Sequence, residues 1–104
     1  MSHSAFLTGV VNTWNGLLPL LASVLTEHTV KWQPDGRALG IEIRAHRHLA
    51  LVQAWDQAQC LDVTIMDIAA ETSTILSAGP CAQPTDVSDR LGLLARAIRG
   101  GDAV

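Results

Sequence analysis

Residues 38–78 read ALGIEIRAHRHLALVQAWDQAQCLDVTIMDIAAETSTILSA, and this stretch decides the fold. It holds four runs of strand length, several of them rich in β-branched residues, at positions 38–44, 48–55, 60–68 and 72–78. The breaks between the runs are only three or four residues long. A parallel crossover needs about a dozen residues or more, so breaks this short predict antiparallel strands that follow one another as a meander.

The pattern within each run predicts its place in the sheet. In the first run, leucine and isoleucine alternate with small or charged residues, which is typical of a strand with one buried and one wetted face. The run 48–55 is apolar on both faces and fits the centre of the sheet, whereas the more polar run 72–78 fits an edge. Residues 29–33 could add another edge strand, ahead of a Pro-Asp-Gly-Arg turn signal. We therefore predict four or five strands between about residues 29 and 78.

Helical periodicity flanks this block on both sides. Residues 4–26 carry an apolar stripe at steps of three and four, formed by Phe6, Val10, Trp14, Leu17, Leu21 and Val24. Pro19 either kinks this helix or splits it near Gly16, and we favour one kinked helix. Residues 86–99 repeat the stripe, with aspartates in the first turn and arginines in the last, which suits the helix dipole. The prediction is a single α+β domain over residues 1–104, an antiparallel sheet of four to five strands with the N-terminal and C-terminal helices packed on one face.

The composition favours a cytoplasmic domain that associates with another protein. Of the 104 residues, 48% are hydrophobic and only 16% are charged, and so little charge gives weight to an obligate partner or a homodimer. The most apolar run, residues 16–25, is about half of what a bilayer span requires, and no signal peptide is recognisable. The two cysteines, Cys60 and Cys81, match no zinc or redox spacing and are expected to be reduced thiols. We therefore expect no membrane association and a cytoplasmic location.

The distribution of charge matters more than the net charge of −3. Residues 48–89 hold six Asp or Glu and no Lys or Arg, whereas all seven basic residues lie outside this segment. Phosphate binding needs a basic face, so the acidic segment argues against nucleic acid as a partner. A basic protein is a better partner, because complementary charge speeds encounter and suppresses wrong contacts. The alternative is that these acids are ordinary solvated residues of turns and strands.

No motif for catalysis, cofactor binding or metal binding is recognisable. His46 and His48 would share one face of a strand, but a zinc site needs three or four ligands and no third one is indicated. Asp62 and Asp67 are five residues apart, which puts them on opposite faces of an unbroken strand and argues against a shared acid–base site. Hydrolase, nucleotide-binding and metalloprotease signatures are missing. We therefore expect no enzyme activity, no cofactor and no metal.

Three tryptophans stand out in a chain with one phenylalanine and no tyrosine. Trp14 lies on the helical stripe and is expected in the core. Trp32 is near the first edge strand, and Trp55 ends the central strand just before Asp56. Tryptophan is favoured both in cores and as an anchor of interfaces. Trp32 and Trp55 therefore either contact a partner or cover the ends of the sheet.

The run LVQAWDQAQCLDVTIMD at residues 51–67 resembles a pattern of small bacterial immunity proteins from polymorphic toxin loci, of the TriTu type. In this pattern a strand ends in Trp, a short turn follows, and the next strand alternates acidic and aliphatic residues up to a Leu/Met-Asp pair. A polar strand and a terminal helix rich in Leu and Arg come next, so the resemblance covers about residues 49–98. The chain departs from the pattern in residues 56–59, which lack a glycine.

The resemblance implies a non-enzymatic inhibitor that binds and neutralises one cognate secreted toxin. Many such toxins attack nucleic acids and present a basic cleft, which an acidic surface can occupy as a decoy for phosphate. We predict Trp55 as the anchor of this contact. The other predicted partner-binding residues are Asp56, Asp62, Asp67, Glu71, Glu42 and Trp32.

Two other classes of function fit the same composition. Small acidic α/β proteins of this size also serve as type III secretion chaperones, which act as homodimers that hold an extended effector segment. A chaperone binds unfolded peptide, whereas an immunity protein binds a folded toxin domain whose gene directly precedes its own. A small enzyme or ligand-binding domain, the third class, requires a deep pocket with perturbed titratable groups.

Overall fold

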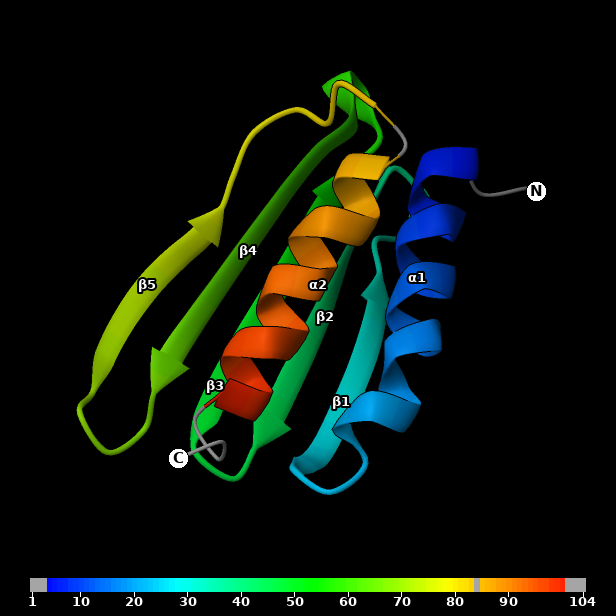
Figure 1. Cartoon of the computed structure of the whole chain (residues 1–104). Coiled ribbons are helices and arrows are strands. Elements are labelled where there is room, and N and C mark those ends of the chain that lie inside the picture. The colour runs from blue at the N-terminus through cyan, green and yellow to red at the C-terminus, as the bar shows by residue number, and fades with distance from the viewer. Residues whose placement is uncertain (1–3, 84, 101–104) are drawn as a thin grey trace.

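The computed structural model describes residues 4–83 and 85–100. Its elements follow in the order α1 (Ala5–Leu21), β1 (Leu25–Trp32), β2 (Ala38–Ala45), β3 (His48–Trp55), β4 (Cys60–Asp67), β5 (Thr72–Ser77) and α2 (Thr85–Gly100). The strands form one antiparallel sheet in sequence order, which confirms the predicted meander and the central place of β3 (Figure 1). A single 3₁₀ turn, η1 (Gln57–Gln59), joins β3 to β4.

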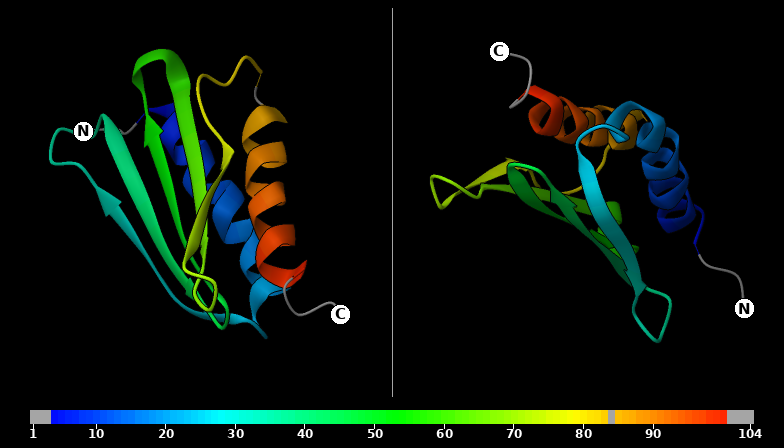
Figure 2. Two further views of the ribbon diagram at one scale, coloured as in Figure 1. Left: turned by 90° about the vertical axis from the view of Figure 1, so that its left-hand side faces the viewer. Right: turned by 90° about the horizontal axis from the view of Figure 1, so that it is seen from below.

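Both helices lie on the same face of the sheet, as predicted (Figure 2). The strands direct alternate side chains to that face, where they meet the apolar stripes of α1 and α2. Within the described residues, no polar or charged residue is buried. The largest fully buried side chains come from both layers: Trp14, Leu7, Leu21, Ile41, Leu61, Leu91, Leu94, Ile98, Val10, Val52 and Val63.

The first helix is shorter than the apolar stripe suggests. It begins after Ser4, whose hydroxyl caps the first turn, and ends at Leu21 rather than at residue 26. Pro19 lies inside this helix and does not split it. The chain then turns and enters β1 at Leu25, four residues before the predicted strand. Residues 25–28 pair with β2 instead of extending the helix, so tertiary pairing overrides the helical stripe.

The second helix matches its prediction to within one residue at each end. Its first-turn Asp86 and last-turn Arg99 complement the helix dipole. Neither α1 nor α2, the helices of the described residues, is long and apolar enough to cross a bilayer.

One polar contact ties the first helix to the first strand. The Trp14 indole is fully buried, and its Nε1–H donates to Nδ1 of His28 at 3.3 Å. The two rings meet edge to face with their centroids 5.8 Å apart. The core position predicted for Trp14 is confirmed.

The segment between β5 and α2 is fastened to the sheet instead of forming a free loop. The Cys81 N–H donates to the Gln59 carbonyl at 2.9 Å. From α2, the guanidinium of Arg90 reaches over and donates to three carbonyls at 2.6–2.9 Å, those of Leu61, Gly79 and Pro80. One arginine thus joins the helix, the fourth strand and the incoming segment.

Candidate functional site

The face of the sheet that the helices leave uncovered, called the open face below, is the first candidate for a binding surface. Leu51 lies in register with Thr64 and Ile75, and Leu49 lies in register with Met66 in the next row. The leucines, the methionine and the isoleucine form an apolar patch across β3, β4 and β5, and Ile75 is 70% exposed. An exposed apolar patch on a small protein marks an interaction surface.

Trp55 stands at one end of the open face, beside a shallow hollow of about 750 Å³. The residue ends β3 and is 37% exposed. The exposed Asp56 follows it, and the Asp56 N–H donates to the Arg37 carbonyl at 2.9 Å, which fastens the β3–β4 turn to the β1–β2 turn. The hollow lies between these two turns, and Asp35 and Gln33 complete its rim. The structure therefore places an aromatic side chain and a carboxylate together at an accessible edge.

The turn after Asp56 has an unusual backbone. Ala58 and Gln59 have φ values of 58° and 49°, in the left-handed region that normally favours glycine. A non-glycine residue held there costs about 1–2 kcal/mol. The β1–β2 turn, by contrast, uses Gly36 at a φ of 72°. The β3–β4 turn thus keeps side chains where glycine would be more stable.

Asp62 also lies on the open face, diagonally across from Trp55. Its register partner is Gln53, and the register partner of Trp55 is Cys60, two residues away along β4. The half-buried Asp62 accepts the Gly79 N–H at Oδ1, at 3.0 Å. Its carboxylate therefore adds negative charge beside Trp55 and also holds the segment after β5.

Asp67 and Glu71 lie at the opposite end of the sheet from Trp55. Asp67 is seven positions along β4 from Cys60, the register partner of Trp55, which corresponds to roughly 23 Å at the rise of a strand. Asp67 Oδ1 accepts the Ala70 N–H at 2.9 Å and so closes the β4–β5 turn, in which Glu71 is exposed. The structure does not bring these two acids to the Trp55 end.

The remaining two predicted residues also lie apart from Trp55. Glu42 is on the open face in β2, where its carboxylate pairs with Lys31 Nζ at 3.1 Å. Trp32 is in register with Leu39, a core position, so its side chain lies on the helix side of the sheet and packs against the core. Trp32 therefore packs against the core at one end of the sheet, on the face opposite to Trp55.

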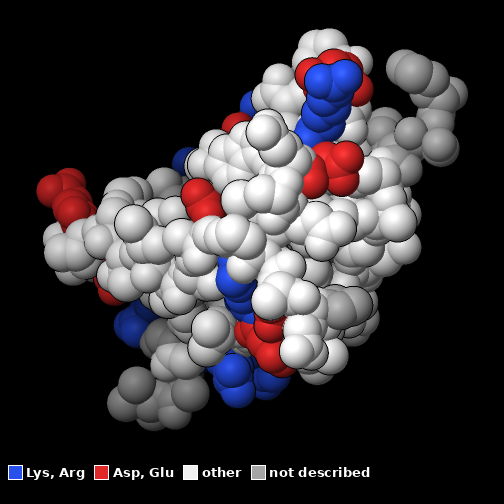
Figure 3. All heavy atoms as spheres, turned by 90° about the horizontal axis from the view of Figure 1, so that it is seen from above, with Lys and Arg blue, Asp and Glu red and all other residues white. Residues whose placement is uncertain are grey.

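Half of the acids in residues 48–89 hold the backbone in place. Besides Asp62 and Asp67, Asp86 accepts two N–H groups of the segment before α2, at 2.8 and 3.0 Å. Figure 3, which looks onto the end that carries the β3–β4 turn, shows acidic and basic side chains in several separate groups. The acidic segment therefore does not form one continuous negative face at this end.

The apolar patch is the part of the candidate site that the sequence interpretation does not single out. Its signal is present in residues 48–55, which are apolar on both faces although the helices cover only one. A strand that is apolar on both faces in a sheet with one covered face predicts an apolar open face. Combining these two predictions would have located the patch.

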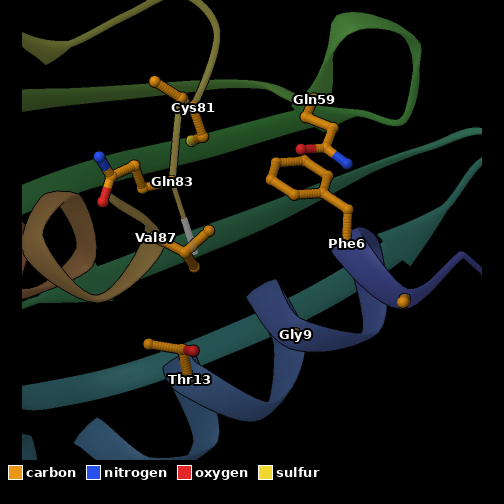
Figure 4. Close-up of a pocket in the computed structure, with 9 residues that line it drawn as sticks. Phe6, Gly9, Thr13, Gln59, Cys81, Gln83 and Val87 are labelled. Atoms are coloured by element: carbon orange, nitrogen blue, oxygen red, sulfur yellow. The ribbon is translucent and has the colours of Figure 1, made fainter. Parts of the chain in front are cut away.

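A second hollow, of about 330 Å³, lies between the first turns of the two helices. Phe6, Val87 and Cys81 project toward it from α1, α2 and the segment before α2 (Figure 4). Cys81 is 8% exposed, and burial raises the pKa of its thiol although Arg90 acts in the opposite direction. Among the described residues that line this hollow, Cys81 is the only titratable one. A thiol held protonated without a neighbouring base is a poor nucleophile.

The histidine pair does not gather further metal ligands. Among residues 4–83 and 85–100, no group of three or more His, Cys, Asp or Glu side chains could hold a metal ion. His46 is exposed in the β2–β3 turn, and His48 is half-buried at the start of β3. The two histidines therefore occupy a turn and the end of a strand.

Among known proteins, no family model, no curated protein and no solved structure matches this chain.

Proposed function

We propose that the protein is an immunity protein that binds a cognate secreted bacterial toxin and neutralises it by covering the active site or substrate cleft of the toxin. One observation carries the proposal: the sheet has an uncovered face, with an apolar patch across β3–β5 and the exposed Trp55 and Asp56 at its end. The resemblance of residues 49–98 to immunity proteins of the TriTu type supports the same function.

The open face has the residue composition that is typical of a protein interface. The apolar patch supplies a centre depleted of charge, and Trp55 supplies an anchor of the kind that dominates binding energies. The strands beneath the patch are held by neighbours, and β3 has one on each side. A preformed sheet loses little conformational entropy when a partner docks, so more of the contact energy remains as affinity.

The charge of the open face favours a basic partner at the Trp55 end. On the β1–β2 side of the face, Glu42 pairs with Lys31 and Glu27 pairs with Arg44, so these charges offset one another. Around Trp55, three aspartates at positions 35, 56 and 62 outnumber one arginine at position 37. Negative charge beside an aromatic anchor suits the basic cleft of a toxin that acts on nucleic acid.

Three described residues other than glycine have a positive φ, Ala58 and Gln59 in the β3–β4 turn and Glu71 in the β4–β5 turn, so this backbone feature occurs at both ends of the sheet. Residues in the left-handed region without glycine cluster at functional sites, where the side chain or the turn shape is retained in spite of its cost. Ala58 and Gln59 are such residues, and they lie within four positions of Trp55.

The direct test of the proposal removes the anchor. Trp55→Ala should weaken binding of the toxin domain encoded directly upstream of this gene by about 30-fold or more, because an interface tryptophan contributes about 2 kcal/mol or more. Isothermal titration calorimetry with the purified toxin domain measures the change. A thermal melt of the variant shows that the fold is retained.

Leu93→Ala is the matched control. Leu93 is 42% exposed, close to the value for Trp55, but it lies on α2 on the covered side of the sheet. This variant should bind the toxin domain as the wild type does. Equal affinity of the wild type and Trp55→Ala would exclude the Trp55 end as the contact surface.

A homodimeric secretion chaperone is the second candidate, and one feature favours it. β5 is an edge strand without a charged residue, which suits self-association. The same calorimetric experiment separates the two functions when the toxin domain is added either folded or unfolded in urea and diluted. An immunity protein binds the folded domain, whereas binding of the unfolded chain alone would support the chaperone.

A further inference from the structure

The two edges of the sheet differ in how they are protected against pairing with another chain. β1 forms one edge and carries Glu27 and Lys31, and its register with β2 shifts between Leu25 and Glu27. Charged side chains and bulges are the devices that usually keep an edge strand from pairing. Both are present on β1, so this edge is protected.

β5 forms the other edge and has less protection. Its sequence TSTILS holds no charged residue and no proline, and its register with β4 is regular from Thr72 to Ile75 before it shifts. Among the elements of residues 4–83 and 85–100, none lies beyond this strand in Figures 1 and 2. The only other strand of the sheet without Asp, Glu, Lys or Arg is β3, which has neighbours on both sides. In its lack of charged residues, β5 is therefore similar to a strand that pairs with a neighbouring strand on both sides.

Apolar exposure is concentrated at the same edge. Five large hydrophobic residues are exposed in the described structure, and two of them, Ile68 and Ile75, belong to the β4–β5 hairpin. Ile75 is the most exposed of the five, at 70%. An uncharged edge with exposed isoleucines is the arrangement that promotes association of strands.

We infer that β5 pairs with β5 of a second copy of this chain. A two-fold axis through Thr74 places Thr74 opposite Thr74 of the other copy, and Ser73 opposite Ile75, so that each pair shares one face of the sheet. Hydroxyl and β-branched pairs of this kind stabilise antiparallel strands, and the absence of charge means that no like charges face each other across the axis. The uncharged side chains of β5 can face those of a second β5 without repulsion. A charged peptide would find no opposite charge on this strand.

The pairing joins two sheets into one of ten strands. Antiparallel neighbours related by a two-fold axis perpendicular to the sheet keep the same face, so all four helices lie on one side and both open faces lie on the other. The paired segment is short and buries less than the roughly 1,200 Å² of a standard interface, so we expect a dissociation constant in the micromolar range.

The test is sedimentation equilibrium of the full chain alone, between about 5 and 500 μM, which spans the expected range. The wild type should pass from monomer to dimer. Ile75→Lys should weaken the dimer at least about tenfold, because a lysine on an edge strand prevents pairing and the two lysines repel across the axis. Ser73→Lys, on the same strand and face, should have the same effect. Thr29→Lys, an exposed position on the β1 edge, is the matched control and should leave the dimer unchanged.

The experiment needs no toxin, so its outcome does not depend on the immunity function. Circular dichroism melts show whether each variant is folded, and Ile75 and Ser73 are both exposed enough to accept lysine. A wild type that stays monomeric up to the highest concentration would overturn the inference. So would a dimer that resists both β5 variants or that dissociates with Thr29→Lys.

Discussion

Replacement of Trp14 by alanine should lower the free energy of unfolding by about 3–5 kcal/mol. The side chain is fully buried between α1 and the sheet, and its N–H is bonded to His28. Alanine leaves a cavity in the core and an acceptor on His28 without its donor. Since a domain of this size is stable by only about 5–15 kcal/mol, this single change removes a large share of the total. Urea denaturation followed by circular dichroism measures the loss.

Trp55→Ala provides the matched control, because it removes the same side chain from a position that is 37% exposed on the open face. It should cost less than half as much stability. Trp14→Phe, which keeps most of the packing but removes the N–H donor, should fall between the wild type and Trp14→Ala. Equal losses from Trp14→Ala and Trp55→Ala would contradict the assignment of one residue to the core and the other to a binding surface.

Arg90→Met should lower the free energy of unfolding by about 2–3 kcal/mol. Methionine retains the apolar stem but donates no hydrogen bond, and Arg90 donates to carbonyls of β4 and of the segment before α2. Hydrogen bonds from a charged group are stronger than neutral ones, and two of the three bonds, those to the carbonyls of Leu61 and Gly79, are part-buried. Urea denaturation gives the total loss, and hydrogen exchange should show faster exchange of the Cys81 amide.

Arg96→Met is the control for this prediction. Arg96 lies on the same helix, is exposed, and should change the stability by no more than about 0.5 kcal/mol when replaced. If the two variants were equally stable, Arg90 would not be the connection between helix, strand and segment that its geometry indicates.

The architecture could be predicted from the sequence because its signals are local. Short breaks between the apolar runs allow only antiparallel neighbours, and alternation within the runs predicts which face is covered. The end of α1 could not be predicted in this way. Val24 continues the helical stripe, yet the residues that follow it pair with β2, and a stripe carries no information about a strand that lies 20 residues further along the chain.

The candidate site could be predicted only in part. Trp55 and Asp56 are adjacent in the chain, so the sequence alone shows that they lie close together. The spacing of five residues between Asp62 and Asp67 predicts that they lie on opposite faces of the strand. The face of Trp32 depends on the register across the β1–β2 turn, which places it opposite Leu39. The number of acidic residues predicted the charge of the binding surface less well. A sequence shows each carboxylate but does not show which backbone N–H group it accepts a hydrogen bond from.

The most direct test of the account is hydroxyl-radical footprinting of the chain, alone and bound to the toxin domain proposed as its partner, with the labelled side chains read by mass spectrometry. If the open face is the binding surface, Trp55 and Met66 become protected in the complex, and the exposed helix residues Leu20 and Leu93 stay as reactive as in the free chain. Protection of Leu20 and Leu93, with Trp55 and Met66 still reactive, would place the toxin on the helices and contradict the account.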